Sequence, residues 1–162
     1  MSQNQHENKH IPSFHPQFCG CVAHDPKMAR AVSDLYGEEL HAISAYTYRS
    51  LLYDRSDLFR DLSKDEMKHF RLLGELILAL GGNPMIRTQI RVDGYELERG
   101  CACVSGRSCT QMLHDSIREE KRTIDRYQTL MGCTTDRIVR SVLAGIVDDE
   151  QRHVEWLCAA IT

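Results

Sequence analysis

The sequence contains the motif Asp-Glu-x-x-His twice, which gives a Glu-x-x-His segment at residues 66–69 and another at residues 150–153. Each copy follows a Glu-Glu pair, found in EELHAISAY (38–46) and in EEKRTIDRY (119–127). From the second Glu of the pair to the Glu of the motif, the distance is 27 residues in the first half and 30 in the second. Carboxylate oxygens and imidazole nitrogens are metal ligands. The chain therefore carries one potential ligand set in two copies.

Glu39 and Glu120, the second members of the Glu-Glu pairs, fall on apolar faces if their segments are helical. The residues three, four and seven positions away are mostly hydrophobic, which is the spacing of one helix face. These neighbours are Val32, Leu35, Ala42, Ile43 and Tyr46 for the first, and Leu113, Ile117, Ile124 and Tyr127 for the second. Glu38 and Glu119 instead share faces with charged residues such as Arg49, and we expect these faces to be solvated.

Both Glu-x-x-His motifs also lie on apolar helix faces. Six side chains are thus expected to point into one core, namely Glu39, Glu66, His69, Glu120, Glu150 and His153. Four carboxylates crowded in a low dielectric repel each other, and each costs several kcal/mol to desolvate. Two divalent cations balance four negative charges, and two neutral imidazoles complete the coordination. The sequence therefore predicts a site for two metal ions.

Four long helices are expected to position these side chains. They run from about 26 to 53, from the polar tetrad 54–57 to Gly81-Gly82, from Ser108 or Thr110 to just before Gly132-Cys133, and from Thr134 or Thr135 to the end of the sequence. Asp25 and Pro26 are typical of a helix start. Two short turns make antiparallel neighbours, and the long connection 83–107, in which only 86–92 alternates like a strand, is a crossover. The prediction is all-α: an antiparallel four-helix bundle built from two helical hairpins.

The bundle is expected to form one domain over residues 25–162, after a polar leader over residues 1–24 that we expect to be poorly ordered. Its longest apolar run, residues 76–80, is too short to span a bilayer, and the N-terminus lacks the features of a signal peptide. The net charge is −3 and no Lys/Arg block exists, which gives no indication of nucleic-acid binding. We expect a cytoplasmic protein without a nucleic-acid or membrane partner.

The seven cysteines are an odd number and are expected to be mostly reduced thiols. Cys19 with Cys21 and Cys101 with Cys103 form two close pairs. We interpret them as reduced cysteines in flexible segments, with a shared four-thiolate metal site or a redox relay as the alternative.

The repeated ligand set resembles that of the ferritin-like diiron-carboxylate superfamily over residues 26–162. The first-half motifs are similar to those of bacterioferritins, and DEQRH (149–153) is similar to the DExRH box of bacterial diiron oxygenases. The resemblance implies that Glu66 and Glu150 bridge two metals. It also implies that Glu39 and Glu120 are terminal ligands, with His69 and His153 supplying one ligand to each metal.

The resemblance also implies roles around the ligands. Asp65 and Asp149 are expected to hydrogen-bond a ligand His on the opposing helix. Tyr46 and Tyr127 lie two turns after the terminal ligands; we expect them to pack in the core, with proton or radical delivery as the alternative.

The sequence differs in places from bacterioferritins and from rubrerythrins, a related family with a similar ligand set. Rubrerythrins carry a further Glu where this chain has Thr123, and they contain a rubredoxin module whose cysteine motifs this sequence does not show. Bacterioferritins continue into a fifth helix that helps to close a storage cage. Met67 stands where bacterioferritins place a haem-ligating Met, and the sequence leaves haem binding open.

The resemblance implies a dinuclear iron oxidoreductase that acts on O2 or H2O2, with oxidation of Fe(II) as the main expectation and two Fe ions per chain, or Mn with the same ligands. Peroxide removal, as in peroxidases or manganese catalases, is an alternative. A non-enzymatic bundle that binds or delivers metal is an alternative of another class. We expect a homodimer and an electron donor that the sequence does not identify.

Overall fold

The computed structural model describes residues 21–86 and 108–161. They form four helices: α1 (Pro26–Leu52), α2 (Ser56–Ala79), α3 (Cys109–Gly132) and α4 (Arg137–Ala159). All four agree with the predicted segments to within a few residues. The strand-like stretch and most of the predicted crossover and leader lie outside the described residues, as do Cys19, Cys101 and Cys103.

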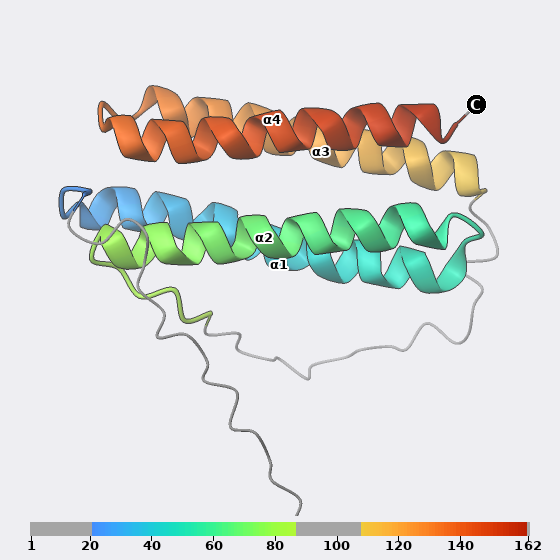
Figure 1. The fold of residues 1–162 in the computed structure, drawn as a ribbon, viewed down its shortest axis with the longest axis horizontal. Helices are drawn as coiled ribbons and strands as arrows, with labels where there is room; N and C mark the ends of the chain where they lie inside the picture. Colours follow the sequence, from blue (N-terminus) through green and yellow to red (C-terminus); the bar gives the residue numbers. More distant parts are fainter. Residues whose placement is uncertain (1–20, 87–107, 162) are drawn as a thin grey trace, which may run out of the picture.

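The helices are arranged as two antiparallel hairpins, α1 with α2 and α3 with α4, stacked as two layers (Figure 1). Helices pack closely within each hairpin, whereas fewer residues approach each other between the hairpins, where α2 faces α4 and α1 faces α3. The fold is the predicted four-helix bundle. Among the described residues, no helix combines the length and hydropathy that crossing a membrane requires.

Side-chain caps explain most helix starts. Asp25 accepts hydrogen bonds from the backbone N–H groups of Lys27 and Met28 at 3.0 Å, and Ser108 accepts one from Gln111 at 3.1 Å. The expected cap of α4 by Thr134 or Thr135 is wrong, because Asp136 is the N-cap.

The helix α2 begins without a side-chain cap, since Arg55 occupies the N-cap position. At its other end, the helix stops at Ala79, two residues earlier than expected. Gly81 has a φ of +83°, and Gly81 and Gly82 donate to the carbonyls of Leu78 and Ile77. This C-terminal motif needs a glycine at its left-handed position.

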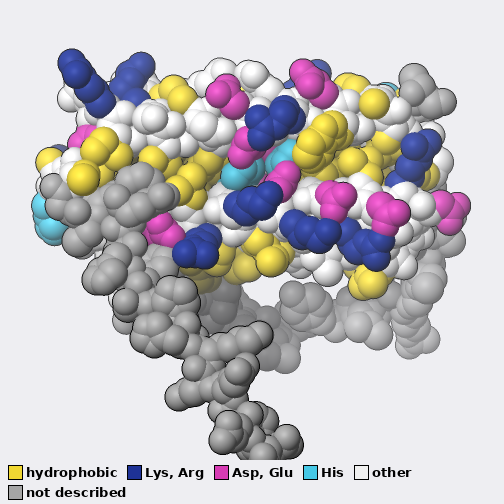
Figure 2. All heavy atoms as spheres, viewed as in Figure 1, with side chains coloured by type: hydrophobic (Ala, Val, Ile, Leu, Met, Phe, Trp, Pro, Cys, Tyr) yellow, Lys and Arg dark blue, Asp and Glu magenta, His cyan; other side chains and the backbone are white. Residues whose placement is uncertain are grey.

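The core consists of two apolar clusters on either side of a polar zone. One cluster lies at the N-terminal ends of α1 and α4 and the C-terminal ends of α2 and α3, with Leu76 and Leu143 fully buried. The other cluster contains Phe59, Leu62 and Leu113. Each such side chain stabilises the fold by about 1.5–3 kcal/mol. The outer surface over α2 and α4 instead alternates charges of both signs (Figure 2).

Candidate metal centre

The polar zone holds all six predicted ligand residues, and each is at most 4% exposed: Glu39, Glu66, His69, Glu120, Glu150 and His153. Each helix contributes at the same height of the bundle, α1 and α3 with one Glu, and α2 and α4 with one Glu and one His. The helix period that places apolar residues around each Glu is what directs these polar groups inward.

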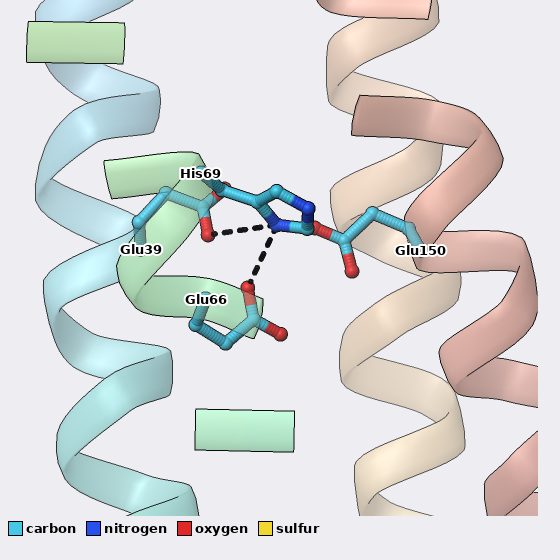
Figure 3. Close-up of side chains that lie close together, drawn as sticks. All are labelled: Glu39, Glu66, His69 and Glu150. Carbon is cyan, nitrogen blue, oxygen red and sulfur yellow. Dashed lines mark hydrogen bonds and ion pairs between the residues drawn. The ribbon is translucent and has the colours of Figure 1, made fainter. Parts of the chain in front are cut away.

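Their atoms form two groups of four potential ligands. Glu39, Glu66, His69 and Glu150 form one group, and Glu66, Glu120, Glu150 and His153 the other, with the ligand atoms of each group within 4.8 Å of one another. Figure 3 shows the first group, with the His69 ring between the carboxylates of three helices. Glu66 and Glu150 belong to both groups.

The two shared carboxylates each offer one oxygen to each imidazole. His69 Nδ1 lies 3.2 Å from Glu66 Oε2 and 3.2 Å from Glu150 Oε1. His153 Nδ1 lies 3.2 Å from Glu66 Oε1 and 2.9 Å from Glu150 Oε2. This is the arrangement that two bridging carboxylates need.

Each of the remaining carboxylates lies beside one imidazole only. Glu39 Oε2 is 3.8 Å from His69 Nδ1, and Glu120 Oε2 is 4.0 Å from His153 Nδ1. Tyr46 donates a hydrogen bond to Glu120, and Tyr127 donates one to Glu39. Each tyrosine therefore holds the carboxylate of the other hairpin, a link that their spacing along the chain did not predict.

The outer nitrogen of each imidazole faces an aspartate of the opposing helix. His69 Nε2 lies 3.1 Å from Asp149 Oδ2, within hydrogen-bond distance. His153 Nε2 lies 3.6 Å from Asp65 Oδ2, which is longer than a hydrogen bond. An Nε2 proton held by a carboxylate leaves the Nδ1 lone pair free to point at a metal.

The pKa values of the buried glutamates are shifted in both directions. Burial and the charge of Glu66 raise the pKa of Glu39 well above its usual value, and burial with the charges of Glu150 and Glu66 does the same for Glu120. Burial opposes ionisation of Glu150 as well, but hydrogen bonds from His153 and His69 outweigh it and lower the pKa to about 2.

The imidazoles respond in the opposite sense. Burial lowers their pKa, but hydrogen bonds to Glu150 and Glu66 outweigh it and raise the pKa of His69 to about 11 and that of His153 to about 10. The shifts thus disfavour ionisation of Glu39 and Glu120 and favour protonated imidazoles beside the carboxylate of Glu150.

The donor set fits two divalent ions. Glu66 Oε1 and Glu150 Oε1 are buried and each lies 3.2 Å from an imidazole nitrogen, but among the described residues neither has a hydrogen bond of good geometry. A cation between these atoms would satisfy them. With neutral imidazoles, four carboxylates carry four negative charges against the four positive charges of the ions. Oxygen-rich ligands with imidazole suit Fe or Mn.

One residue that the sequence placed in solvent is buried. Arg49 is only 8% exposed, because α3 covers its face of α1, and its Nη2 lies 2.7 Å from Glu119 Oε2. Glu119 is exposed as expected, and Glu38 is partly exposed and pairs with Arg126. Helix periodicity predicts on which face of α1 Arg49 lies, but it does not predict that α3 packs over this face.

Residues outside the cluster are less informative. Met67 is 52% exposed on α2. Of the described cysteines, Cys21, Cys109, Cys133 and Cys158 are free thiols.

Comparison with known proteins gives consistent matches. The family model of the ferritin-like domain matches residues 38–162. The bacterioferritin of Streptomyces coelicolor is 27% identical over 142 residues, which cover 82% of this chain and 78% of that protein.

Two solved bacterioferritins share the fold. That of Desulfovibrio desulfuricans, described with a diiron site, superposes with a TM-score of 0.67 at 21% identity and covers 83% of this chain and 78% of its own. That of Rhodobacter capsulatus, described with a metal-free dinuclear site and haem iron, gives 0.70 at 20% identity and 86% of both chains.

Proposed function

The chain belongs to the ferritin-like domain family, and on this premise we propose that it oxidises Fe(II) at a dinuclear iron centre, with O2 or H2O2 as the oxidant. The functional unit in this proposal is the bundle of residues 25–162. One observation carries the proposal: Glu66 and Glu150, both buried, each direct one oxygen to His69 and the other oxygen to His153.

In this proposal each ligand has a distinct role. Glu66 and Glu150 would hold both ions, whereas Glu39 and Glu120 would each hold one. Two bound Fe(II) ions would supply one electron each, which is the number that reduction of O2 to H2O2, or of H2O2 to water, consumes. Mn is the alternative occupant, since the same ligands accept it.

The surrounding residues keep the ligands in place. Tyr46 and Tyr127 restrain the terminal carboxylates through their hydrogen bonds. Asp149 accepts a hydrogen bond from the Nε2–H group of His69, which would keep Nδ1 directed at the centre. The apolar clusters on both sides of the polar zone keep water away from it, which limits competing reactions.

Stopped-flow absorption tests the function. Metal-free protein is loaded with two Fe(II) per chain without oxygen, then mixed with O2 or with H2O2, and the near-ultraviolet absorbance of Fe(III) is followed. Rapid oxidation of the bound Fe(II) by either oxidant supports the proposal. Consumption of H2O2 over many turnovers without further Fe(II) indicates peroxide removal, and no reaction beyond that of free Fe(II) indicates a metal-binding bundle without this activity.

The working form that we propose is a cytoplasmic homodimer with a separate electron donor. Sedimentation analysis of the metal-loaded chain measures the oligomer directly, and a closed multi-subunit cage would contradict the dimer.

A further inference from the structure

A pocket of about 350 Å³ lies between α1 and α3. Small side chains, Ala42, Ala45 and Thr123, create the space. Tyr46 and Glu120 also line it, and their mutual hydrogen bond belongs to the cluster described above. The pocket therefore extends from the surface of the bundle to one of the proposed metal ligands, and its size suits a small organic molecule.

Two ion pairs join α1 to α3 along this pocket. Arg126 of α3 pairs with Glu38 of α1, and Arg49 of α1 pairs with Glu119 of α3. Glu38 and Arg49 are eleven residues apart on one helix, which corresponds to about 16 Å. The ion pairs thus hold the two helices together on both sides of the small residues and leave the space between them open.

Arg49 is an incompletely partnered buried cation. Its Nη2 donates to Glu119, but its Nη1 is buried and, within the part of the chain that the structure describes, has no acceptor. Its guanidinium carbon lies 5.1 Å from the centre of the Tyr46 ring, which favours the charge but supplies no hydrogen-bond acceptor. A buried charged donor without an acceptor is costly, and an anion would complete it.

The internal repeat shows that Arg49 is not required by the fold. Aligning EELHAISAY (38–46) with EEKRTIDRY (119–127) places Leu130 at the position equivalent to Arg49. Leu130 belongs to the apolar core cluster. The second hairpin therefore has a leucine at this position, whereas Arg49 gives the pocket a buried positive charge that the equivalent position of the other hairpin lacks.

The charge of the lining indicates the kind of ligand. The lining contains three arginines and three glutamates. Glu38 and Glu119 pair with Arg126 and Arg49, and Glu120 accepts the hydrogen bond of Tyr46. Arg122 is exposed at the rim, donates Nε to a backbone carbonyl, and forms no ion pair with any described residue. Arg49 at Nη1 and Arg122 thus keep guanidinium donors without a carboxylate partner among the described residues, which matches a ligand that brings one carboxylate.

We propose that this pocket binds a small organic monocarboxylate. The carboxylate accepts hydrogen bonds from Arg49 and Arg122, and the carbon skeleton lies against Ala42, Ala45 and the Tyr46 ring. Guanidinium groups match the geometry of a carboxylate. An inorganic phosphate would place more negative charge beside the glutamates of the lining and would gain nothing from the apolar wall. Binding requires only this chain's side chains, and we expect it with and without bound metal.

Calorimetry and methyl NMR of the full chain test the proposal, with benzoate as the probe. We expect saturable binding of benzoate and concentration-dependent shifts of the Ala42 and Ala45 methyl signals, in both metal-free and iron-loaded protein. Benzamide, which has the same shape without the charge, should bind at least about tenfold more weakly, as expected for the loss of a charge-assisted hydrogen bond.

Two variants locate the site independently. Arg49→Leu introduces the residue of the other repeat and should weaken benzoate binding at least about tenfold. Ala45→Leu fills the pocket but keeps the arginine, and it should abolish binding even if Arg49→Leu folds poorly. Arg60→Leu removes an exposed arginine of α2, outside the pocket, and should leave binding unchanged.

Several results would overturn the proposal. They are no saturable benzoate binding, equal binding of benzamide, tighter binding of inorganic phosphate that shifts the same methyl signals, or unchanged affinity in both pocket variants. None of these results bears on iron oxidation, so the proposal can fail while the proposed function stands.

Discussion

The two glutamates of each Glu-Glu pair differ in their surroundings although they are adjacent in sequence. Glu39 is 1% exposed and accepts a hydrogen bond from Tyr127, whereas Glu38 is partly exposed and pairs with Arg126. Glu39→Gln should therefore reduce single-turnover iron oxidation by at least about tenfold, because the neutral amide loses the charge that holds the metal. Glu120→Gln should behave in the same way. Stopped-flow absorbance and metal content measure both effects.

Glu38→Gln is the matched control, and it should change stability by less than about 0.5 kcal/mol and leave oxidation intact. Glu119 is a poorer control than its sequence position indicates, since it pairs with the buried Arg49. Inactivity of the Glu38 variant together with an active Glu39 variant would contradict the assignment of ligands on α1.

The shared carboxylates should differ from the terminal ones in how many ions they hold. Glu66→Ala or Glu150→Ala should lose both ions, because each side chain offers an oxygen to both halves of the cluster. Metal analysis after anaerobic loading measures this. Glu75→Ala removes another buried glutamate of α2 that lies outside both ligand groups, so it should retain two ions. One tightly held ion in either ligand variant would count against bridging.

At the scale of the helices, the start of α4 depends on one side chain. Asp136 accepts hydrogen bonds from the backbone N–H groups of Ile138 and Val139 at 2.8 and 3.1 Å. Asp136→Ala should lower the free energy of unfolding by about 1 kcal/mol. Thr135→Ala, at the neighbouring exposed residue, should change it by less than about 0.5 kcal/mol. Denaturant unfolding compares the two, and an equal effect would contradict the capping role.

The sequence was sufficient to predict the four helices and the inward direction of all six proposed ligand residues. Helix periodicity and the internal repeat were enough for both predictions, because the helices and the inward-facing positions depend on residue spacing along a single helix. The burial of Arg49 could not be predicted in this way, because it results from the packing of α3 against α1. The cap of α4 was missed for a local reason: Thr134, Thr135 and Asp136 are all good capping residues, and the sequence does not rank them.

For the whole molecule, the ligand cluster joins the two hairpins, so metal binding and stability should be linked through pH. Without metal, Glu39, Glu120 and both imidazoles have raised pKa values, and the native state binds more protons than the unfolded state above about pH 6. Stability therefore falls as pH rises, by up to about 1.4 kcal/mol per pH unit for each such group. The lowered pKa of Glu150 affects stability only at acidic pH, because the unfolded carboxyl is already ionised at pH 6.

We expect metal-free protein to be less stable at pH 8 than at pH 6, by on the order of 2–4 kcal/mol. Metal-loaded protein should change less, because the ions displace these protons. Denaturant unfolding at both pH values, with and without metal, measures the difference. Equal stability of the metal-free form at the two pH values would show that the groups are not buried together.

The near-equivalence of the two hairpins has a consequence for the origin of the chain. Each hairpin contributes two carboxylates, one imidazole and one tyrosine that donates a hydrogen bond to a glutamate of the other hairpin. Two identical copies of one hairpin, related by a twofold axis, would supply the complete set, so an ancestral gene of half this length could have encoded a working homodimer. Fusion of two such copies frees each half to mutate alone. Arg49 opposite Leu130 is a difference that an ancestor with identical halves could not have had.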